Sequence, residues 1–458
     1  MAKYKAYPEY KTISSSWLDS IPNGWEPLPL KYLCSSFVKD GPHETPVFLE
    51  EGIPFLSVDG IQDNKIVFEG CRYISPSDHF RFSQKCKPVK GDVLLGKSAS
   101  IGKVALVDTS REFNVWSPLA VITPIRSCLS KFIYYSLQTT MLQAQCEVYS
   151  NSNTQKNLGM STIDNLDFAM PSDQEASTIS NFLDHETAKI DSLIEKQQQL
   201  IELLKEKRQA VISHAVTKGL NPDVPMKDSG VEWLGEVPVH WDICLLKYKC
   251  SAITDGAHIS PDTNEGEHYF VSIKDIKKGM IDFNNSLLTS SASYKYLVKT
   301  GCKPFNGDIL FSKDGTIGQT AIVPDDVNFV VASSLIIIRA DKEKASPAFM
   351  DLLLQSSLVI EQVESFVKGT ALRRLSIQNL EKVFGIFPTL SEQQIISDYV
   401  YTQLNRLDVL ESKAVVQIQL LEERRTALIS AAVTGKIDVR DWKAPDARKT
   451  EEPQEATI

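Results

Sequence analysis

The stretch GDVLLGKSASIG at Gly91–Gly102 returns, with changes, as GDILFSKDGTIG at Gly307–Gly318. The likeness extends much further, because residues 17–219 are written a second time at 233–436. This repeat is far longer than the 20–50 residues of a solenoid unit. Each copy is therefore expected to be a globular domain with its own connector. A molecule with two such domains is suited to a ligand that has two similar halves.

The size and composition of the chain favour a globular protein that stays inside the cell. Its 458 residues suggest about three domains of ~150 residues, which the repeat refines to two large units with helical connectors. No apolar run approaches the ~20 residues of a membrane span, and the N-terminus lacks a signal-peptide core. The eight cysteines show neither CxxC pairs nor metal-ligand spacing, which fits a reducing cytoplasm. The net charge of −9 argues against a generally basic surface but leaves room for local basic faces.

Both copies begin with a region typical of a mixed α+β globule. Short apolar runs such as Ile53–Val58 and Leu119–Ile122 alternate with turn residues and predict strands, whereas 130–145 has helical spacing. We expect a first target domain at 17–172 and a second at 233–389. Around them we expect a flexible lead-in (1–16), a linker (218–232) and a disordered polar tail (436–458).

A long helix is predicted after each globule. Capping boxes at Ser172-x-x-Glu175 and Thr389-x-x-Glu392 open helices expected at 173–217 and 390–435. At 1.5 Å per residue each would be roughly 65 Å long. Apolar residues spaced three and four apart predict a coiled-coil seam. Its interface residues are expected to be Ile190, Leu193, Leu200, Leu204, Leu407, Leu410, Leu421 and Leu428.

An isolated helix of this kind would leave its apolar stripe in water, so each needs a partner. The nearest partner is the other copy within the same chain, and the chain path then makes the pair antiparallel with a pseudo-twofold internal repeat. The alternative is that the two helices serve ordinary homodimerisation.

The loop at Gly96–Lys103 resembles a nucleotide-binding P-loop only at first sight. It has five residues between its glycines where the motif has four, and Val104 follows where Ser or Thr is required. A hairpin loop that carries Lys97 and Lys313 at equivalent positions, suited to phosphate contact, is the better interpretation. A plain surface hairpin is the alternative. The other candidate DNA contacts on these two loops are Ser98, Lys103, Asp314 and Thr316.

A second polar loop precedes each long helix and differs between the copies. The first copy carries Asn153, Thr154, Gln155 and Lys156, and the second carries Arg373 and Arg374. Asn, Gln and Arg are the side chains best able to read base edges. Differences here, within a framework that matches, suit a reader of two different half-sites, although an unconstrained surface loop would also differ.

Turn histidines at matched positions, His43 in DGPH and His258 in DGAH, complete the candidate DNA-binding residues. Neither has further metal ligands at usable spacing. Asp262, Asp275 and Lys277 match a loose nuclease pattern, but the first copy lacks its equivalent, and a solvated strand end is the simpler interpretation. The sequence contains no Asn-Pro-Pro-aromatic or Asp-Pro-Pro-aromatic methylase tetrad and no glycine-rich cofactor loop after a strand, so the chain is expected to be non-catalytic. Because no ligands stand at usable spacing, it is also expected to bind no metal.

These features together resemble the specificity subunit of type I restriction–modification enzymes, over essentially the whole chain. The resemblance rests on the duplication and on four motifs: VEWLGEVP from Val231 with Trp241, GDIL–DGTIG from Gly307, Pro388 through Glu392-Gln393 at a helix start, and RRxALIxxAVTG from Arg424. The first copy departs at Asp19-Ser20 and at Ser98-Ala99-Ser100, which leaves the use of its hairpin loop open.

The resemblance implies a DNA reader with two target recognition domains for a split, asymmetric site in double-stranded DNA. It also implies two modification subunits, which use S-adenosylmethionine to methylate adenine, and two restriction subunits, which use ATP and Mg. This chain itself would bind no cofactor and no membrane. Three alternatives are a stand-alone enzyme, a structural coiled-coil protein, and the DNA-recognition subunit of another methylation-linked phage-defence system.

Overall fold

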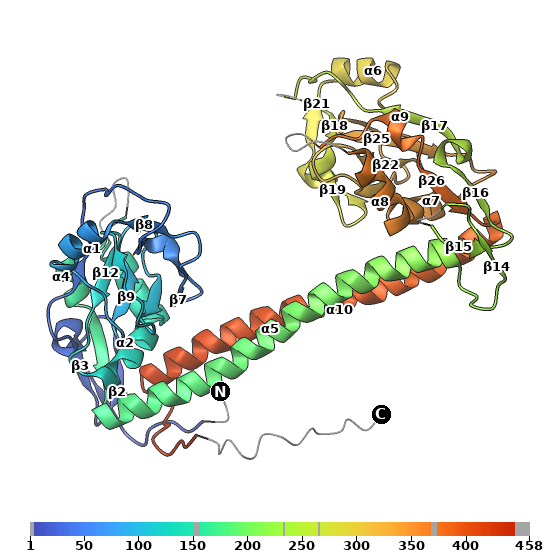
Figure 1. Ribbon diagram of the computed structural model, residues 1–458. Coiled ribbons are helices and arrows are strands. Elements are labelled where there is room, and N and C mark those ends of the chain that lie inside the picture. Colours follow the sequence, from blue (N-terminus) through green and yellow to red (C-terminus); the bar gives the residue numbers. More distant parts are fainter. Residues whose placement is uncertain (1–3, 151–155, 232–233, 264–265, 368–372, 445–458) are drawn as a thin grey trace. The chain divides into compact units, whose positions relative to one another are not determined.

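The computed structural model describes residues 4–150, 156–231, 234–263, 266–367 and 373–444 (Figure 1). The chain forms two compact units: unit 1 comprises residues 1–197 and 416–458, and unit 2 comprises residues 198–415. Each unit holds one α+β globule and a part of both long helices. No described helix is long and apolar enough to cross a membrane.

The globule of unit 1 is built on a four-stranded and a three-stranded sheet. The first has the order β10 (Val104–Leu106), β9 (Val93–Gly96), β12 (Leu119–Ile122) and β4 (Lys39–Asp40). The second has the order β11 (Asn114–Val115), β5 (Ile53–Leu56) and β8 (Arg72–Ile74), with β11 and β5 parallel. Two further pairs are β3 (Glu26–Pro29) with β13 (Asp167–Met170) and β6 (Ile61–Gln62) with β7 (Lys65–Ile66). The helices are α1 (Pro76–Ser83), α2 (Ser130–Leu137), α3 (Thr140–Val148) and α4 (Met160–Asp164).

The globule of unit 2 repeats this topology strand for strand. Its four-stranded sheet has the order β23 (Thr320–Ile322), β22 (Ile309–Ser312), β25 (Leu335–Ala340) and β17 (Cys250–Asp255). Its three-stranded sheet joins β24 (Phe329–Val331), β18 (His268–Val271) and β21 (Leu287–Thr289), with β24 and β18 parallel. The further pairs are β16 (Asp242–Leu245) with β26 (Phe384–Phe387) and β19 (Ile276–Lys277) with β20 (Met280–Ile281). The helices are α6 (Ser291–Lys299), α7 (Pro347–Leu354), α8 (Ser357–Phe366) and α9 (Ile377–Leu380).

Residues 4–16 and 436–444 are more ordered than the sequence suggested. Instead of a flexible lead-in, β1 (Tyr10–Thr12) pairs with β2 (Ser20–Pro22), and Tyr7 is buried. The same hairpin recurs in unit 2 as β14 (Met226–Asp228) with β15 (Glu236–Pro238). At the other end, Ile437 and Val439 join the core of unit 1, and the amide of Asp438 donates to the Lys5 carbonyl at 2.7 Å. The repeat therefore begins before Trp17, and residues 436–444 are not a disordered tail.

The single helix expected at 130–145 is broken into α2 and α3. Thr139 interrupts it because its hydroxyl accepts a hydrogen bond from the amide of Leu142, so the residue caps a new helix. Helical spacing alone did not reveal this break, since both helices present apolar residues to the same core.

Both long helices are present, as α5 (Asp173–Lys218) and α10 (Leu390–Val433). Ser172 and Thr389 accept from the amides of Glu175 and Glu392, as the capping pattern predicted. The two carboxylates accept from buried indoles, at 3.0 Å from Trp25 Nε1 and 3.2 Å from Trp241 Nε1. Each helix start is thus tied to the hairpin region of its own globule.

The two helices run antiparallel within the chain. In unit 1, Arg425 Nε lies 3.0 Å from Asp191 Oδ1, and in unit 2 Arg208 pairs with Asp408. A step from 191 to 208 along α5 corresponds to the same step backwards, from 425 to 408, along α10. This confirms the predicted antiparallel coil.

The predicted seam is wrong for part of each helix. Ile190, Leu204, Leu407, Leu421 and Leu428 are buried or half-buried. The other three, Leu193, Leu200 and Leu410, are 46%, 40% and 46% exposed. The less exposed positions of α5 instead run 190, 194, 197, 201 and 204, which places the polar Gln197 in line. Choosing the nearest leucines therefore shifted the predicted stripe by one residue.

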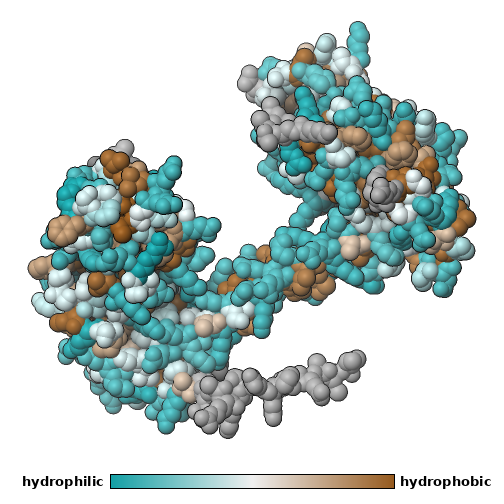
Figure 2. Space-filling model, in the orientation of Figure 1, coloured by the Kyte–Doolittle hydropathy of each residue, from teal (hydrophilic) through white to brown (hydrophobic). Residues whose placement is uncertain are grey.

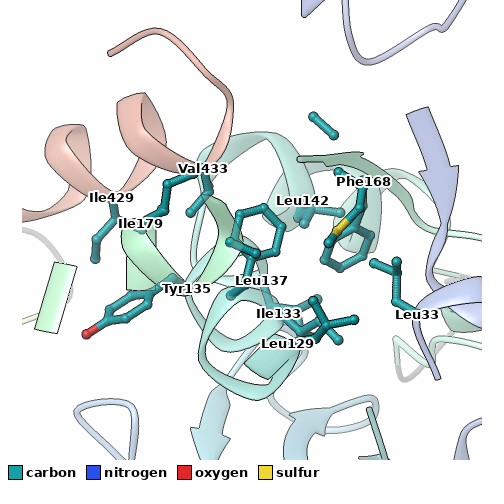
Figure 3. Close-up of a cluster of buried hydrophobic side chains, with 14 of the residues drawn as sticks. Leu33, Leu129, Ile133, Tyr135, Leu137, Leu142, Phe168, Ile179, Ile429 and Val433 are labelled. Atoms are coloured by element: carbon teal, nitrogen blue, oxygen red, sulfur yellow. The ribbon is translucent and has the colours of Figure 1, made fainter. Parts of the chain in front are cut away.

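In unit 1 the globule packs on both long helices. Figure 3 shows Ile133 and Leu137 of α2 beside Leu142 of α3 and Phe168 of β13, with Ile179 of α5 on the same cluster. Ile429 and Val433 of α10 lie beside Ile179 in the same cluster. Apolar side chains also remain on the helix surface, visible as brown areas in Figure 2.

Candidate nucleic-acid interface

The two loops that sequence analysis treated separately lie side by side in each unit. In unit 1 the amide of Leu158 donates to the carbonyl of Lys97 at 2.8 Å, and in unit 2 the amide of Leu375 donates to Lys313 at 2.9 Å. Adjacent β-bridges join Ser98 to Asn157 and Asp314 to Arg374. The hairpin loop and the variable polar loop thus form one surface in each globule.

The side chains of Lys97 and Lys313 are buried, at 7% and 4% exposure. Lys97 Nζ lies 3.2 Å from Asp40 Oδ2, and Lys313 Nζ lies 2.5 Å from Asp255 Oδ2. A buried ammonium is tolerated because a carboxylate pairs with it. This corrects the expectation that both lysines reach outward from their loops, whereas DNA contact near them stays a prediction.

Asp40 and Asp255 begin the matched turns DGPH and DGAH, whose glycines leave no room for a side chain. A Cβ on Gly41 would lie 1.7 Å from the carbonyl oxygen of Val115, and one on Gly256 would lie 2.0 Å from that of Ala332. The turns are held by hydrogen bonds from the amide of Ser117 to Pro42 (3.2 Å) and from that of Ser333 to Ala257 (3.0 Å). Glycine is therefore required for the turn to dock on the strand end.

Each turn ends in an exposed histidine that shares the aspartate with the buried lysine. His43 Nε2 lies 3.1 Å from Asp40 Oδ2, and His258 Nε2 lies 2.9 Å from Asp255 Oδ2. The histidine side chains are 70% and 64% exposed. Burial acts to raise the pKa of Asp40, but hydrogen bonds and charge from Lys85 and Lys97 outweigh it and hold the pKa below its usual range.

The remaining candidates divide by exposure. Arg373 and Arg374 are more than half exposed and pair with Glu364 (3.4 Å) and Asp314 (2.9 Å). Lys156 is also about half exposed and pairs with Glu147. Thr316 is exposed, and its carbonyl accepts from Ser312. Asn153, Thr154 and Gln155 lie outside the described residues.

Lys103 does not extend from its loop as expected. Its Nζ donates to the carbonyl of Ile61 at 2.9 Å, so the side chain ties the hairpin loop to β6. Sequence reasoning also missed Asp40 and Asp255, which pair with the buried lysines, and the half-exposed Lys85, which also contacts Asp40. The repeated Asp-Gly step was the available signal, but nothing in the sequence places it beside a lysine 57 or 58 residues later.

The loose nuclease pattern in unit 2 has a structural explanation. Asp275 accepts from the amide (2.7 Å) and hydroxyl (3.0 Å) of Ser272 and so caps the short helix η5 (Ile273–Asp275). Lys277 pairs with Asp282 at 2.7 Å. Among the described residues there is no group of three or more His, Cys, Asp or Glu placed to hold a metal ion.

Comparisons with known proteins agree with this repeated architecture. The family model described as "Type I restriction modification DNA specificity domain" matches residues 22–203 and 248–418. The Type I restriction enzyme EcoBI specificity subunit of Escherichia coli is 23% identical over 38% of this chain, and the match spans about a third (36%) of that relative. The Type I restriction enzyme MjaIX specificity subunit of Methanocaldococcus jannaschii is 23% identical over 77% of this chain and 79% of its own length.

A solved structure shares the fold at low sequence identity. It comes from work on the "complex assembly and conformational transition of the type I R-M system" and is 14% identical. The alignment covers 91% of this chain and 99% of that one, with a TM-score of 0.68.

Proposed function

We propose that this chain, which belongs to the type I restriction–modification DNA specificity family, reads the two halves of an asymmetric double-stranded DNA site with its two globules. The antiparallel helices would set the distance between the half-sites. The observation that carries the proposal is the matched loop surface in both units, whose framework repeats while its exposed residues differ.

Base reading is assigned to the part of the surface that differs. Arg373 and Arg374 expose planar guanidinium groups that are able to contact guanine edges. The equivalent positions of unit 1 are Lys156 and Asn157. Ser98 and Thr316 lie on the adjoining hairpin loops and would donate to the DNA backbone through their hydroxyl groups. Asp314 lies on the same loop of unit 2 and would orient Arg374 through their ion pair. Asn153, Thr154 and Gln155 remain sequence candidates for the same role.

The chain would act without catalysis of its own and would hold two modification and two restriction subunits. The assembled complex would methylate adenine at N6 and cleave DNA with ATP, using S-adenosylmethionine and Mg bound by those partners. Family membership supports this division of work. The DNA-recognition subunit of another methylation-linked defence system is the second candidate, and the methyltransferase that co-purifies with the chain separates the two.

Genome-wide mapping of methylated adenines, in cells with and without this chain, tests the proposal. We expect one bipartite motif to lose methylation when the chain is absent. Unchanged methylation at every motif would overturn the proposal. Purified chain alone is expected neither to cut nor to methylate DNA, and metal-dependent cleavage lost in Asp275→Asn would contradict that expectation.

A further inference from the structure

The histidine, aspartate and lysine of each loop surface form the same three-residue cluster twice. In unit 1 it is His43, Asp40 and Lys97, and in unit 2 it is His258, Asp255 and Lys313. The lysine is buried, the aspartate is largely buried, and the histidine is exposed. The surface therefore presents the imidazole, whereas the ammonium group is hidden behind it.

The geometry leaves one ring nitrogen free of the cluster. Because Nε2 faces the aspartate in both units, Nδ1 lies on the opposite side of an exposed ring. A protonated imidazole donates from both nitrogens, so Nδ1–H can donate to an outside acceptor while Nε2–H binds the carboxylate. In unit 1 the carboxylate is also held by Lys85 Nζ at 2.6 Å, which fixes it further.

We infer that His43 and His258 contact DNA phosphates and that Lys97 and Lys313 act as positioning residues. This inference rests on the proposed function. The cluster recurs unchanged where the variable loops differ, and two different half-sites share only their phosphate backbone. A residue that serves both halves alike is therefore suited to the phosphate and not to a base. The buried lysine fixes the aspartate, and the aspartate fixes the ring.

The inference is tested with the full chain and two labelled duplexes, one with the mapped motif and one scrambled, over a series of KCl concentrations. His43→Gln and His258→Gln are each expected to weaken binding to both duplexes by the same factor, roughly 3- to 10-fold, and to lower the salt slope. The control is His240→Gln, since His240 is also partly exposed and lies 2.9 Å from a carboxylate, Glu392, at a helix start. It is expected to bind as the parent chain does.

The positioning role is tested in unit 2, where Lys313→Met alone removes the buried cation beside Asp255 and is expected to destabilise the fold. Asp255→Ala with Lys313→Met removes both charges. This double variant should keep the melting temperature of the parent chain and lower the salt slope of DNA binding as much as His258→Gln does. Adding His258→Gln to it should weaken binding no further. If the double variant binds like the parent chain, or if its loss of affinity adds to that of His258→Gln, the positioning role is overturned.

Two outcomes overturn the phosphate contact. Parent-like binding by both histidine variants shows that the rings only close their turns, and loss confined to the motif duplex shows a base contact. If the parent chain itself does not distinguish the motif from the scrambled duplex, the proposed function fails instead, so the two failures are separable.

Discussion

The globule of each unit is fastened to its long helix by a tyrosine–aspartate hydrogen bond, with the tyrosine on the globule in unit 1 and on the long helix in unit 2. In unit 1, Tyr135 on α2 donates to Asp184 on α5 at 2.8 Å. In unit 2, Tyr401 on α10 donates to Asp351 on α7 at 3.3 Å. Residue 401 is the repeat of 184, whereas 351 is the repeat of 134, the position before Tyr135. Both junctions thus contain a tyrosine–aspartate hydrogen bond, although the donor lies on the globule in one unit and on the long helix in the other, and the position on the globule differs by one residue.

This difference moves a carboxyl group from the helix surface into a core. Asp184 is about a third exposed and also pairs with Lys131. Asp351 is buried among the leucines of α7, and its Oδ1 has no hydrogen-bond partner. Burial raises the pKa of Asp351 to about 6, although hydrogen bonds from Thr320, Tyr401 and Gln355 act in the opposite direction. The burial of Asp351 therefore makes the stability of unit 2 sensitive to pH near neutrality.

The largest expected effect comes from giving the junction of unit 1 the donor and acceptor order of unit 2. Tyr135→Asp places a carboxyl group at a buried position beside the partly exposed Asp184 and should destabilise unit 1 by about 3–5 kcal/mol. Adding Asp184→Tyr puts the hydroxyl donor on α5 and should recover more than half of that loss. Urea unfolding of the full chain measures both variants. A double variant no more stable than Tyr135→Asp would show that the two junctions are not interchangeable.

The pH dependence of unit 2 is the next effect. The pKa of Asp351 is raised on folding from 3.8 to about 6, so the native state holds its proton more tightly. The contribution of Asp351 to the free energy of unfolding is thus fully present below pH ~4 and is lost as the pH rises through 6. This fall in stability is about 3 kcal/mol at most. Asp351→Asn should remove this fall and be the more stable chain at pH 7.5. Melting curves from pH 4 to 8 check it, with Asp184→Asn as the control that keeps the fall.

A smaller effect should separate the units in DNA reading. Arg373→Ala or Arg374→Ala is expected to cost ~1–3 kcal/mol in binding and to relax only the half-site read by unit 2. Methylation mapping on each variant is the measurement, and Lys156→Ala is the matched change in unit 1. If every motif position stays as sharp as in the parent chain, the loops are scaffold.

The smallest effect concerns the helix seam. Leu200→Asp, at a position 40% exposed, should cost under about 1 kcal/mol. Leu404→Asp, at a buried position of α10, should cost several times more because it buries an unpaired charge. Urea unfolding compares the two, and equal losses would restore the seam first predicted from leucine spacing.

Features that depend on local sequence were predicted well. The repeat, the start of both long helices at Ser172 and Thr389, and their antiparallel pairing all follow from motifs, spacing and chain path. The sequence did not predict which residues between 193 and 200 face the partner helix. Polar and apolar residues both occur in that stretch, so only the contact with the other helix selects the buried face.

Features that depend on long-range pairing were predicted poorly. A lysine on a glycine-rich loop is expected to be exposed, and Lys97 and Lys313 are buried because Asp40 and Asp255 pair with them. No residue close to either lysine in the sequence indicates these ion pairs. Likewise, the N-terminal segment was taken as flexible, since the residues that cover Tyr7 come from the start of α5 and from beyond α10.

The discontinuous composition of unit 1 has a consequence for synthesis on the ribosome. Unit 2 is one continuous segment and is complete once residue 415 has emerged, whereas the core of unit 1 also needs Ile429, Val433 and Ile437. At about 5–20 residues per second, the 245 residues from 197 to 442 take roughly 12–50 s. The domain that is translated first is therefore the last to close. Until then Ile179 and Phe182 lack their final cover, which makes this interval the one in which a chaperone matters most.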